Sequence, residues 1–384
     1  MKNAPEPIVI TGMGLLSPLG DSVSLLWQRL LAGESAVCNW PDLQEEGYRV
    51  SKACRLDDFT APPLRRGRML GFTAAREAIR QAGLTLPAET GVFIGSTLGE
   101  SRAFEQKAEG HRLNLAGYTV ESFTAFLRQK FKLSGPQRSI ATACAAGNYA
   151  IGAAMSALRS GRASVALAGG VEPFSRLALV GFSRSRAMAT DRCQPFDQNR
   201  SGMLLGEGAA IFVLEKARDA LRRGARPLAE VISLGLSCDA HHPTAPEPEG
   251  RGMATAMRLA LEAGGIGPEA IDWVNAHGSG TRLSDSAEAK AMRHIFGARL
   301  PAISGSKGAI GHALGAASAL ELAICVQGLL HQTVPPTAGH EQADPEAGIN
   351  CTRNARQQPI QYVLNNAFAF GGINSSLLLR RWEN

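Results

Sequence analysis

The chain has 384 residues, of which 45% are hydrophobic and 19% are charged, and its formal net charge is +6. A chain of this size and composition buries a large core, which excludes an intrinsically disordered protein. The 42 glycines and the aromatic content of only 6% are typical of closely packed α/β folds with many tight turns. No stretch is biased enough in composition to be a long linker, so we expect one compact unit.

The charge and the cysteines exclude several classes of function. The positive charge favours an acidic partner, but the basic residues lack interleaved aromatic residues, so we expect no nucleic acid partner. The seven cysteines are scattered and form no CxxC pair, which indicates neither a disulfide framework nor a metal site. The N-terminus has no signal-peptide pattern, and no uninterrupted apolar run reaches the roughly 20 residues that span a bilayer. We therefore predict a cytoplasmic protein with no membrane contact and no cofactor.

Strands and helices are predicted to alternate along the first half of the chain. A buried strand at residues 7–14 ends in a glycine turn, and a helix follows at residues 22–33. The alternation argues for a sheet covered by helices. The remaining elements predicted in this half are a helix at 71–83, strands at 90–96 and 138–144, a helix from there to about 158, and strands at 163–170 and 208–215.

The second half repeats this plan in miniature. It is predicted to contain a strand at 271–278, a helix at 284–297, a strand at 301–306, a helix at 311–330, and closing strands at 362–372 and 375–381. The repetition predicts two halves, residues 1–225 and residues 226–384.

Two of the predicted helices are rich in Ala, Gly and Ser on nearly all sides: the helix after Cys144 and the helix that begins near His312. A helix without a polar face is buried, and small residues allow two backbones to approach closely. We therefore expect these helices side by side at the centre of the molecule, with their N-terminal ends at one cavity. A thiol at a helix start faces the positive end of the helix dipole, which predicts a lowered pKa for Cys144. The alternative for Cys144 is an inert thiol buried in a tight turn.

Five separated motifs occur in one order along the chain. They are TACAAG (142–147), QPFDQNRSGMLLGEGAAIFVLE (194–215), NAHGSGTRLSD (275–285), SGSKGAIGHALGAASALE (304–321) and NAFAFGGINSS (366–376). With them the chain resembles the β-ketoacyl-acyl-carrier-protein synthases that use one Cys and two His. The resemblance implies the α/β thiolase-like fold, which has five layers, αβαβα, two pseudo-duplicated halves and an obligate dimer.

The resemblance also implies the roles of five residues. Cys144 matches the nucleophile that receives an acyl chain from a carrier-protein thioester. His277 and His312 match the histidines that bind the malonyl thioester carbonyl and promote loss of CO2. Lys307 and Glu321 match a supporting pair, in which the lysine favours neutral His312 and the glutamate compensates the buried charge. Taken alone, either histidine would be read as a hydrogen-bonded core residue.

Further positions are implied around these residues. The backbone N–H groups of Cys144 and Phe370 match an oxyanion hole, and Phe370 matches a gate between the acyl pocket and the malonyl side. A plain core phenylalanine is the alternative for Phe370. Residues 65–68, with three arginines just before a helix, match the basic surface that receives an acidic carrier protein, and a solvated helix start is the alternative. The substrate-binding residues implied are Thr281, Phe368, Gly371 and Asn374, and the docking residues are Arg65, Arg66 and Arg68.

The chain departs from the family pattern at several positions. Ala146 stands where Thr or Ser is common, Ser279 where Thr is usual, and Ile373 where Thr is frequent. These positions shape the cavity rather than supply its chemistry. Ala369 replaces a glycine between two phenylalanines, which predicts a stiffer gate loop. Gln194 stands where an arginine often contacts the carrier protein, so docking is expected to differ in detail.

The resemblance implies a 3-oxoacyl-[acyl-carrier-protein] synthase that condenses an acyl-enzyme with malonyl-carrier protein. Asn374 replaces the second cysteine of thiolases, and His312 replaces the asparagine of starter-condensing synthases. The implied partners are acyl- and malonyl-loaded carrier protein and a second subunit, either identical or resembling a chain-length factor. The alternative is a non-catalytic, chain-length-determining or scaffold subunit. Short segments at 50–70 and 97–125 resemble type II polyketide or aryl polyene ketosynthases more than fatty-acid synthases.

Overall fold

The computed structural model describes residues 6–383, and its main feature is a ten-stranded sheet made of two five-stranded halves. The strands of the first half are β1 (Ile8–Leu16), β4 (Gly91–Gly95), β5 (Gln137–Ile140), β6 (Val165–Glu172) and β7 (Gly208–Lys216). Those of the second half are β8 (Ala229–Cys238), β9 (Trp273–Asn275), β10 (Ala302–Ser304), β13 (Tyr362–Ala369) and β14 (Ile373–Arg381).

The two halves have the same topology. The spatial order is β5-β4-β6-β7-β1 in the first half and β10-β9-β13-β14-β8 in the second. In both, the third strand along the chain lies at the outer edge and the first lies at the junction. The halves meet where β1 pairs antiparallel with β8 over only three residues, Ile8–Ile10. This pattern confirms the predicted pseudo-duplication; the division at residues 225 and 226 stays a prediction.

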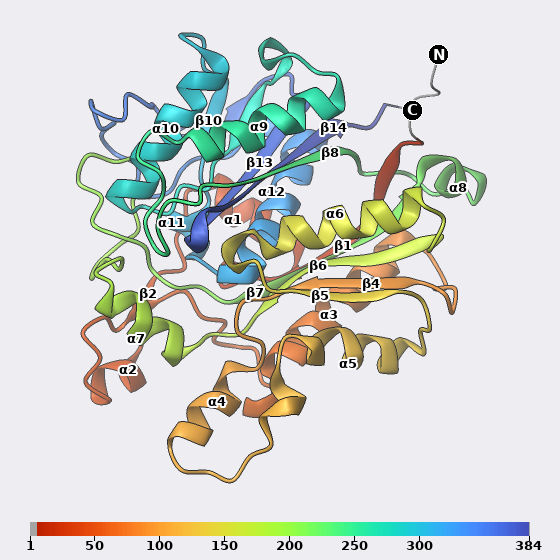
Figure 1. Ribbon diagram of the computed structural model, residues 1–384, viewed down its shortest axis with the longest axis horizontal. Helices are drawn as coiled ribbons and strands as arrows, with labels where there is room; N and C mark the ends of the chain where they lie inside the picture. The colour runs from red at the N-terminus through yellow and green to blue at the C-terminus, as the bar shows by residue number, and fades with distance from the viewer. Residues whose placement is uncertain (1–5, 384) are drawn as a thin grey trace.

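Helices cover both faces of each half-sheet, which gives the predicted five layers (Figure 1). The outer helices of the first half are α3 (Arg66–Ala82) and α5 (Glu121–Phe131), and those of the second are α9 (Arg251–Gly264) and α10 (Arg282–Phe296). Between the half-sheets lie α6 (Ala146–Arg159) and α12 (Ala317–His331). The remaining helices are α1 (Val23–Leu31), α2 (Pro41–Glu45), α4 (Ser101–Ala108), α7 (Arg176–Arg184), α8 (Ala217–Arg222) and the short, fully buried α11 (Lys307–Ile310).

The two central helices pack closely, as their composition predicts. A Cβ atom added at Gly147 of α6 would lie 2.7 Å from the backbone nitrogen of Ala319 of α12, so only glycine fits there. The segment Leu314–His331 is apolar and long enough to cross a membrane by composition, but 89% of it is buried inside the fold. Its hydrophobicity therefore reflects a place in the core.

The ends of the central helices differ from the expected ones. The strand expected at 138–144 ends at Ile140, and Cys144 lies in a 3₁₀ turn, Ala143–Ala145, just before α6. The helix expected at 311–330 begins only at Ala317, because Gly311 (φ +70°, ψ 179°) separates α11 from the following turn. Strand β8 and helix α9 were not predicted.

Candidate active site

The turns before α6 and α12 are equivalent elements of the two halves, and both hold an unusual backbone conformation. Ala143 has φ +47° and Leu314 has φ +44°. Positive φ is costly for residues with a Cβ atom and clusters at functional sites. The first turn carries Cys144, and the second begins two residues after His312. Both side chains line one cavity together with His277, as expected from the placement of the helices.

The expected lowering of the Cys144 pKa was wrong. Burial raises the pKa of this thiol to about 12, although the positive charge of Lys307 acts in the opposite direction. Only 6% of the residue is exposed. The cost of removing the charged thiolate from water therefore outweighs its stabilisation by the start of the helix. Cys144 is therefore a thiol at neutral pH.

His312 is fixed by backbone contacts on both sides. Its N–H donates to the Leu204 carbonyl oxygen (2.8 Å), and its carbonyl oxygen accepts from the N–H of Gly206 (3.0 Å). The ring atom Nδ1 accepts from the N–H of Leu314 at 3.1 Å. The proton of the neutral ring therefore sits on Nε2, where it serves as a donor. Burial first, and then Lys307, hold the pKa of His312 well below its ordinary value, so the ring is neutral, as predicted.

His277 is held by a buried carboxylate. The N–H groups of His277 and Gly278 donate to Glu288 Oε1 and Oε2, at 2.8 and 2.9 Å. The ring of His277 lies edge-on to that of His312, with 5.4 Å between the ring centroids. Burial, Lys307 and His312, in this order, lower the pKa of His277 well below its ordinary value. The cavity therefore contains two neutral imidazoles next to the thiol.

Lys307 and Glu321 form an ion pair behind the histidines. The Lys307 Nζ atom lies 2.5 Å from Glu321 Oε1, and the two side chains are each only 1% exposed. Lys307 also donates to the carbonyl oxygen of His277. Burial raises the pKa of Glu321, and the charge of Lys307 opposes the rise. The pair thus places a positive charge near both rings without leaving it unpaired.

The predicted gate residue lies at the mouth of the cavity. Phe370 is 37% exposed, which rules out a plain core residue, and its ring packs on Phe182 with 5.3 Å between centroids. Ala369 has an ordinary extended backbone (φ −110°, ψ 160°), so alanine costs nothing in this conformation. The left-handed positions are Gly371 (φ +81°) and Gly372 (φ +70°).

The other predicted substrate residues divide into two groups. Thr281, Phe368 and Asn374 line the cavity with the catalytic candidates. Gly371 instead forms the turn at the tip of β13 and β14, where its N–H donates to the carbonyl oxygen of Pro243 at 2.8 Å. Its contribution is therefore to the loop backbone.

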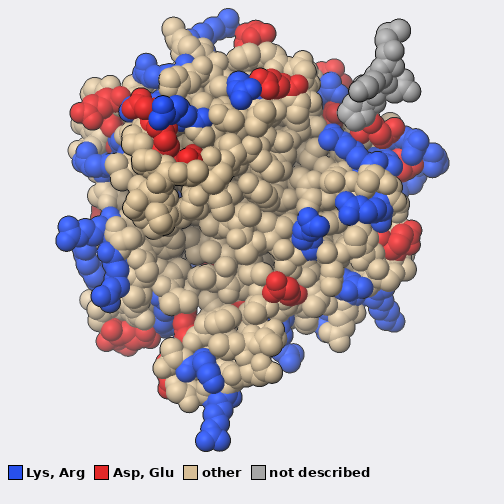
Figure 2. Space-filling model, in the orientation of Figure 1, with Lys and Arg blue, Asp and Glu red and all other residues tan. Residues whose placement is uncertain are grey.

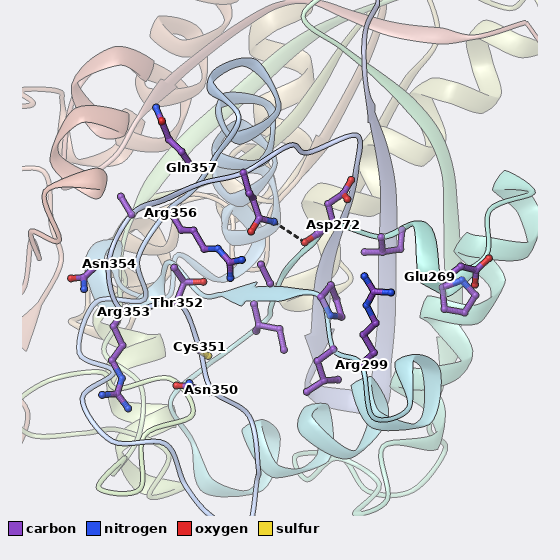
Figure 3. Close-up of a pocket in the computed structure, with 18 residues that line it drawn as sticks. Glu269, Asp272, Arg299, Asn350, Cys351, Thr352, Arg353, Asn354, Arg356 and Gln357 are labelled. Carbon is purple, nitrogen blue, oxygen red and sulfur yellow. Dashed lines mark hydrogen bonds between the residues drawn. The ribbon is translucent and has the colours of Figure 1, made fainter.

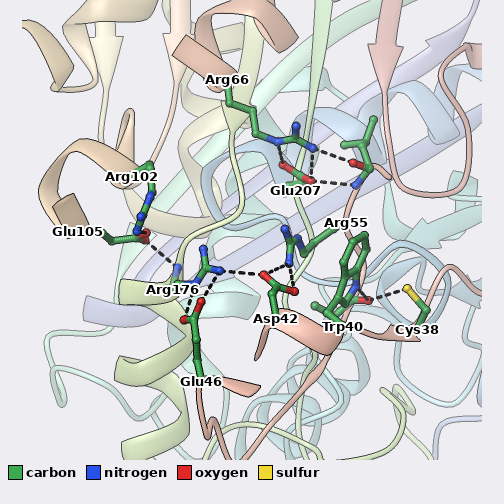
Figure 4. A network of polar contacts seen from close by, with 12 residues as sticks. Cys38, Trp40, Asp42, Glu46, Arg55, Arg66, Arg102, Glu105, Arg176 and Glu207 are labelled. Carbon is green, nitrogen blue, oxygen red and sulfur yellow. Dashed lines mark hydrogen bonds and ion pairs between the residues drawn. The ribbon is translucent and has the colours of Figure 1, made fainter. Parts of the chain in front are cut away.

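Two of the three predicted docking arginines are engaged within the chain. Arg66 makes a two-pronged ion pair with buried Glu207, with both contacts at 2.8 Å (Figure 4). Arg68 contacts Glu100 and lies over the ring of Tyr118, with 15% of its side chain exposed. Arg65 is exposed, and none of the ion pairs in residues 6–383 includes it. Gln194, expected near the carrier protein, is buried.

Sequence reasoning missed three buried carboxylates near the site. Besides Glu288, they are Asp285, which accepts from the N–H groups of Phe196 and Gly280, and Glu172 at the end of β6. Burial raises the pKa of Asp285 to about 6 and those of Glu172 and Glu288 to about 7. Their signal in the sequence is an acidic residue within a run of small or apolar residues, as in VALAGGVE.

A larger hollow lies elsewhere in the described chain. It is a polar groove beside β9 and β10, where the side chains of Arg299 and Arg356 point toward its centre (Figure 3). None of its lining residues also lines the cavity of Cys144. The thiol and the two imidazoles meet in the smaller cavity.

Comparison with known proteins agrees with this arrangement. Residues 5–220 match the family described as beta-ketoacyl synthase, N-terminal domain, and residues 228–341 match beta-ketoacyl synthase, C-terminal domain. The chain is 36% identical to 3-oxoacyl-[acyl-carrier-protein] synthase 2 of Coxiella burnetii, over 97% of this chain and 98% of that protein. It is 35% identical to nodulation protein E of Rhizobium meliloti, over 97% and 99% of the two chains.

Solved structures give the same result. The ishigamide ketosynthase/chain length factor superposes with a TM-score of 0.94 at 36% identity, covering 99% of this chain and all of that chain. A second structure is described as a type II PKS acyl-carrier protein in complex with its ketosynthase. One of its chains superposes with a TM-score of 0.89 at 26% identity, covering 99% of this chain and 100% of that chain. The chain therefore belongs to the β-ketoacyl synthase family and is a condensing acyltransferase of the 3-oxoacyl-[acyl-carrier-protein] synthase type.

Proposed function

We propose that Cys144, His277 and His312 carry the condensation, supported by Lys307 and Glu321. The observation that carries this assignment is the meeting of one thiol and two neutral imidazoles in a single cavity. A non-catalytic scaffold has no use for this set of groups.

In the first half-reaction, Cys144 Sγ attacks the thioester carbonyl carbon of the acyl-carrier protein. The new bond joins Sγ to the acyl carbon, and the bond from that carbon to the carrier sulfur breaks. The thiol proton passes to the departing carrier thiolate, with a neutral imidazole of the cavity available as relay. Because the pKa of Cys144 is about 12, this proton leaves during the attack and not before it.

In the second half-reaction, the malonyl thioester loses CO2 and becomes an enolate. The Nε2–H of His312 donates to the thioester oxygen, where negative charge develops. The enolate carbon attacks the acyl carbon on Cys144, a carbon–carbon bond forms, and the bond to Sγ breaks. The released Cys144 thiolate then takes up one proton from solvent water, which completes the cycle.

The experiment for this assignment is intact-protein and peptide mass spectrometry after incubation with acyl-carrier protein. The acyl mass is expected on the peptide that carries Cys144 and is expected to disappear when malonyl-carrier protein is added. Acyl groups on another cysteine, or none at all, would contradict the assignment.

We infer that the chain works with a second subunit, either identical or similar to a chain-length factor, and with carrier protein in the cytoplasm. Strand β5 forms an open edge of the sheet, and the first two residues of this strand are exposed. The hollow beside it is lined by apolar side chains that include Tyr149, Leu234 and Leu236. The middle of this face is mostly uncharged, with Lys and Arg scattered among Asp and Glu around it (Figure 2). These features support a subunit contact at this edge.

The acyl substrate belongs to fatty acid or polyketide biosynthesis. We favour a dedicated type II polyketide or polyene pathway, supported by the short segments at 50–70 and 97–125 and by the similarity to a ketosynthase/chain length factor structure. The length of the acyl group retained on Cys144, read by mass spectrometry, tests this choice.

The first prediction concerns carrier docking. Arg65→Glu is expected to raise the apparent KM for carrier protein about fivefold, because an exposed charge contributes up to roughly 1 kcal/mol to such a contact. It is also expected to flatten the salt dependence. Arg66 is left intact, since reversal of its charge would break the pair with Glu207. Steady-state kinetics at several salt concentrations measure both effects.

The matched control is Arg353→Glu, which changes an exposed arginine on the groove beside β10. Neither variant is expected to change acylation of Cys144 by a small thioester. An unchanged KM in Arg65→Glu would move the docking surface elsewhere.

The second prediction concerns the gate. Ala369→Gly is expected to speed acylation of Cys144 by about two- to fivefold. Glycine gives the loop backbone more conformational freedom, which lowers the free-energy cost of opening the loop by roughly 0.4–1 kcal/mol. Phe370→Ala removes the contact with Phe182 and is expected to slow condensation more than acylation. Stopped-flow acylation and malonyl-decarboxylation rates separate the two effects. Equal losses in both half-reactions for Phe370→Ala, with no change for Ala369→Gly, would leave Phe370 a space-filling residue.

A further inference from the structure

Glu172, the last residue of β6, ties together two segments that are far apart in the sequence. Its carboxylate accepts from the N–H groups of Thr97 (2.6 Å), Leu98 (3.0 Å) and Gly315 (2.9 Å) and from the Ser96 hydroxyl (3.3 Å). The residue is 1% exposed, and none of the ion pairs among residues 6–383 includes it. A buried carboxylate without a cation is costly, so its hydrogen bonds carry the whole compensation.

The turn at Gly315 is built to reach this carboxylate. A Cβ atom at Gly315 would lie 2.5 Å from the backbone nitrogen of Thr97. The absence of a side chain therefore lets the two backbones touch and lets both N–H groups point at one acceptor. Glu172 thus joins the loop after β4 to the turn before α12.

The same turn sets the orientation of His312. The N–H of Leu314 donates to His312 Nδ1, and the N–H of the next residue, Gly315, donates to Glu172. The φ and ψ angles of Leu314 therefore set how these two N–H groups are oriented relative to each other. Leu314 holds the costly φ of +44° between these two bonds. If the Gly315 bond is lost, Leu314 is free to relax to negative φ, and its N–H turns away from Nδ1.

We infer that Glu172 is a positioning residue for the decarboxylation step: it holds the Leu314 turn so that His312 keeps its proton on Nε2. The inference rests on the role proposed above for His312. Glu172 does not line the cavity with His312 and acts on that residue only through the backbone of the turn. After burial, its charge contributes to the raised pKa of Cys144. Glu288 has the matching task for His277, which it contacts directly.

The ionisation of Glu172 gives this role a pH dependence. Burial raises its pKa to about 7, and only the ionised form accepts on both oxygens without presenting a proton to the N–H donors. As the pH falls through 7, the clamp loosens. The titratable groups on the surrounding elements are Cys144, His312, Glu100 and Glu207. Cys144 and His312 stay neutral, Glu100 caps the start of α3, and Glu207 is paired with Arg66.

Stability is expected to change in the opposite direction. The pKa of Glu172 in the folded protein, about 7, lies above its ordinary value of 4.5 in the unfolded chain. Such a carboxyl group stabilises the fold below the unfolded pKa, and this contribution is lost as the pH rises through the folded pKa. Between pH 8 and 6, the contribution of Glu172 to stability therefore rises while the clamp on His312 loosens. A purely structural role would make activity and stability change together.

The test combines NMR of ¹⁵N-histidine-labelled protein with kinetics. In the wild type at pH 8, the His312 signals, assigned by comparison with His312→Gln, are expected to show a protonated Nε2 and an acceptor Nδ1. They are expected to change with a midpoint near pH 7. In Glu172→Gln, whose amide presents donors to the N–H groups, the Nδ1 signal is expected to lose its hydrogen-bonded position, and kcat for malonyl decarboxylation is expected to fall by 10- to 100-fold with little change in KM.

The matched control is Glu100→Gln, because Glu100 is equally buried and accepts from two backbone N–H groups, of Gly67 and Arg68, at a helix start. This control is expected to keep the wild-type His312 signals and kcat. Unchanged His312 signals in Glu172→Gln would overturn the inference. If this variant does not fold, unchanged His312 signals in the wild type between pH 6 and 8 would overturn it instead. A wild type without decarboxylation would instead overturn the proposed function, while the signals of His312 would still decide the role of Glu172.

Discussion

Cys144→Ala is expected to abolish acyl transfer and condensation, with a fall of at least about 10⁴-fold, because no other group in the cavity can form the thioester. The fold is expected to survive. Only one heavy atom is lost, which costs roughly 1 kcal/mol in a buried position. Condensation assays and thermal unfolding of the purified variant measure the two effects.

Cys144→Gln sharpens this test. The amide of glutamine imitates the acylated thioester, so malonyl decarboxylation is expected to persist or to rise while condensation stays absent. Cys193→Ala is the matched control, since Cys193 is also a thiol whose burial raises its pKa to about 12, but it lies outside the lining of the cavity. Condensation at a near wild-type rate in Cys144→Ala would end the nucleophile assignment.

The second large effect is expected at the buried ion pair. Lys307→Met leaves Glu321 buried without its cation, and Glu321→Leu leaves Lys307 without its anion. Each single variant is expected to lose about 3–5 kcal/mol of the free energy of unfolding. The double variant Lys307→Met/Glu321→Leu removes both charges and is expected to recover most of this loss. Chemical denaturation of the three variants gives these values.

The activity of the double variant separates structure from catalysis. Lys307 donates to the carbonyl oxygen of His277 and, after burial, further lowers the pKa values of both histidines. The double variant loses this hydrogen bond and the contribution of Lys307, while burial remains. Malonyl decarboxylation is therefore expected to stay at least about 100-fold below wild type even when stability is restored. A stable double variant with wild-type decarboxylation would reduce the pair to a structural role.

Much of the fold was predictable because its signals are local. The alternation of strands and helices, the repeated plan and the small-residue composition of α6 and α12 gave the layers and the central helix pair. Strand β8 and helix α9 were missed between the two motif-rich halves. The turns at Cys144 and His312 were mistaken for strand and helix, because a positive φ at Ala143 or Leu314 depends on long-range contacts and has no signal in the side chain.

The site shows the same limit. The motifs identified the residues that meet in the cavity. The shift in the pKa of Cys144 was predicted in the wrong direction, because a helix start can be recognised from the local sequence, whereas burial depends on the whole fold. Arg66 looked like a docking residue until Glu207, 141 residues away, proved to be its partner. Glu172 was missed because its partners, Thr97 and Gly315, contribute only backbone atoms.

The equal topology of the two half-sheets bears on how such a site can arise. Two identical half-length chains related by a twofold axis would bring the same turn, and hence the same side chain, to both sides of their shared cavity. Once both copies lie in a single chain, each turn is free to change independently. Here one turn carries the thiol of Cys144, and the other follows the imidazole of His312. Joining the copies thus permits two chemically different side chains to face each other within a nearly symmetric frame.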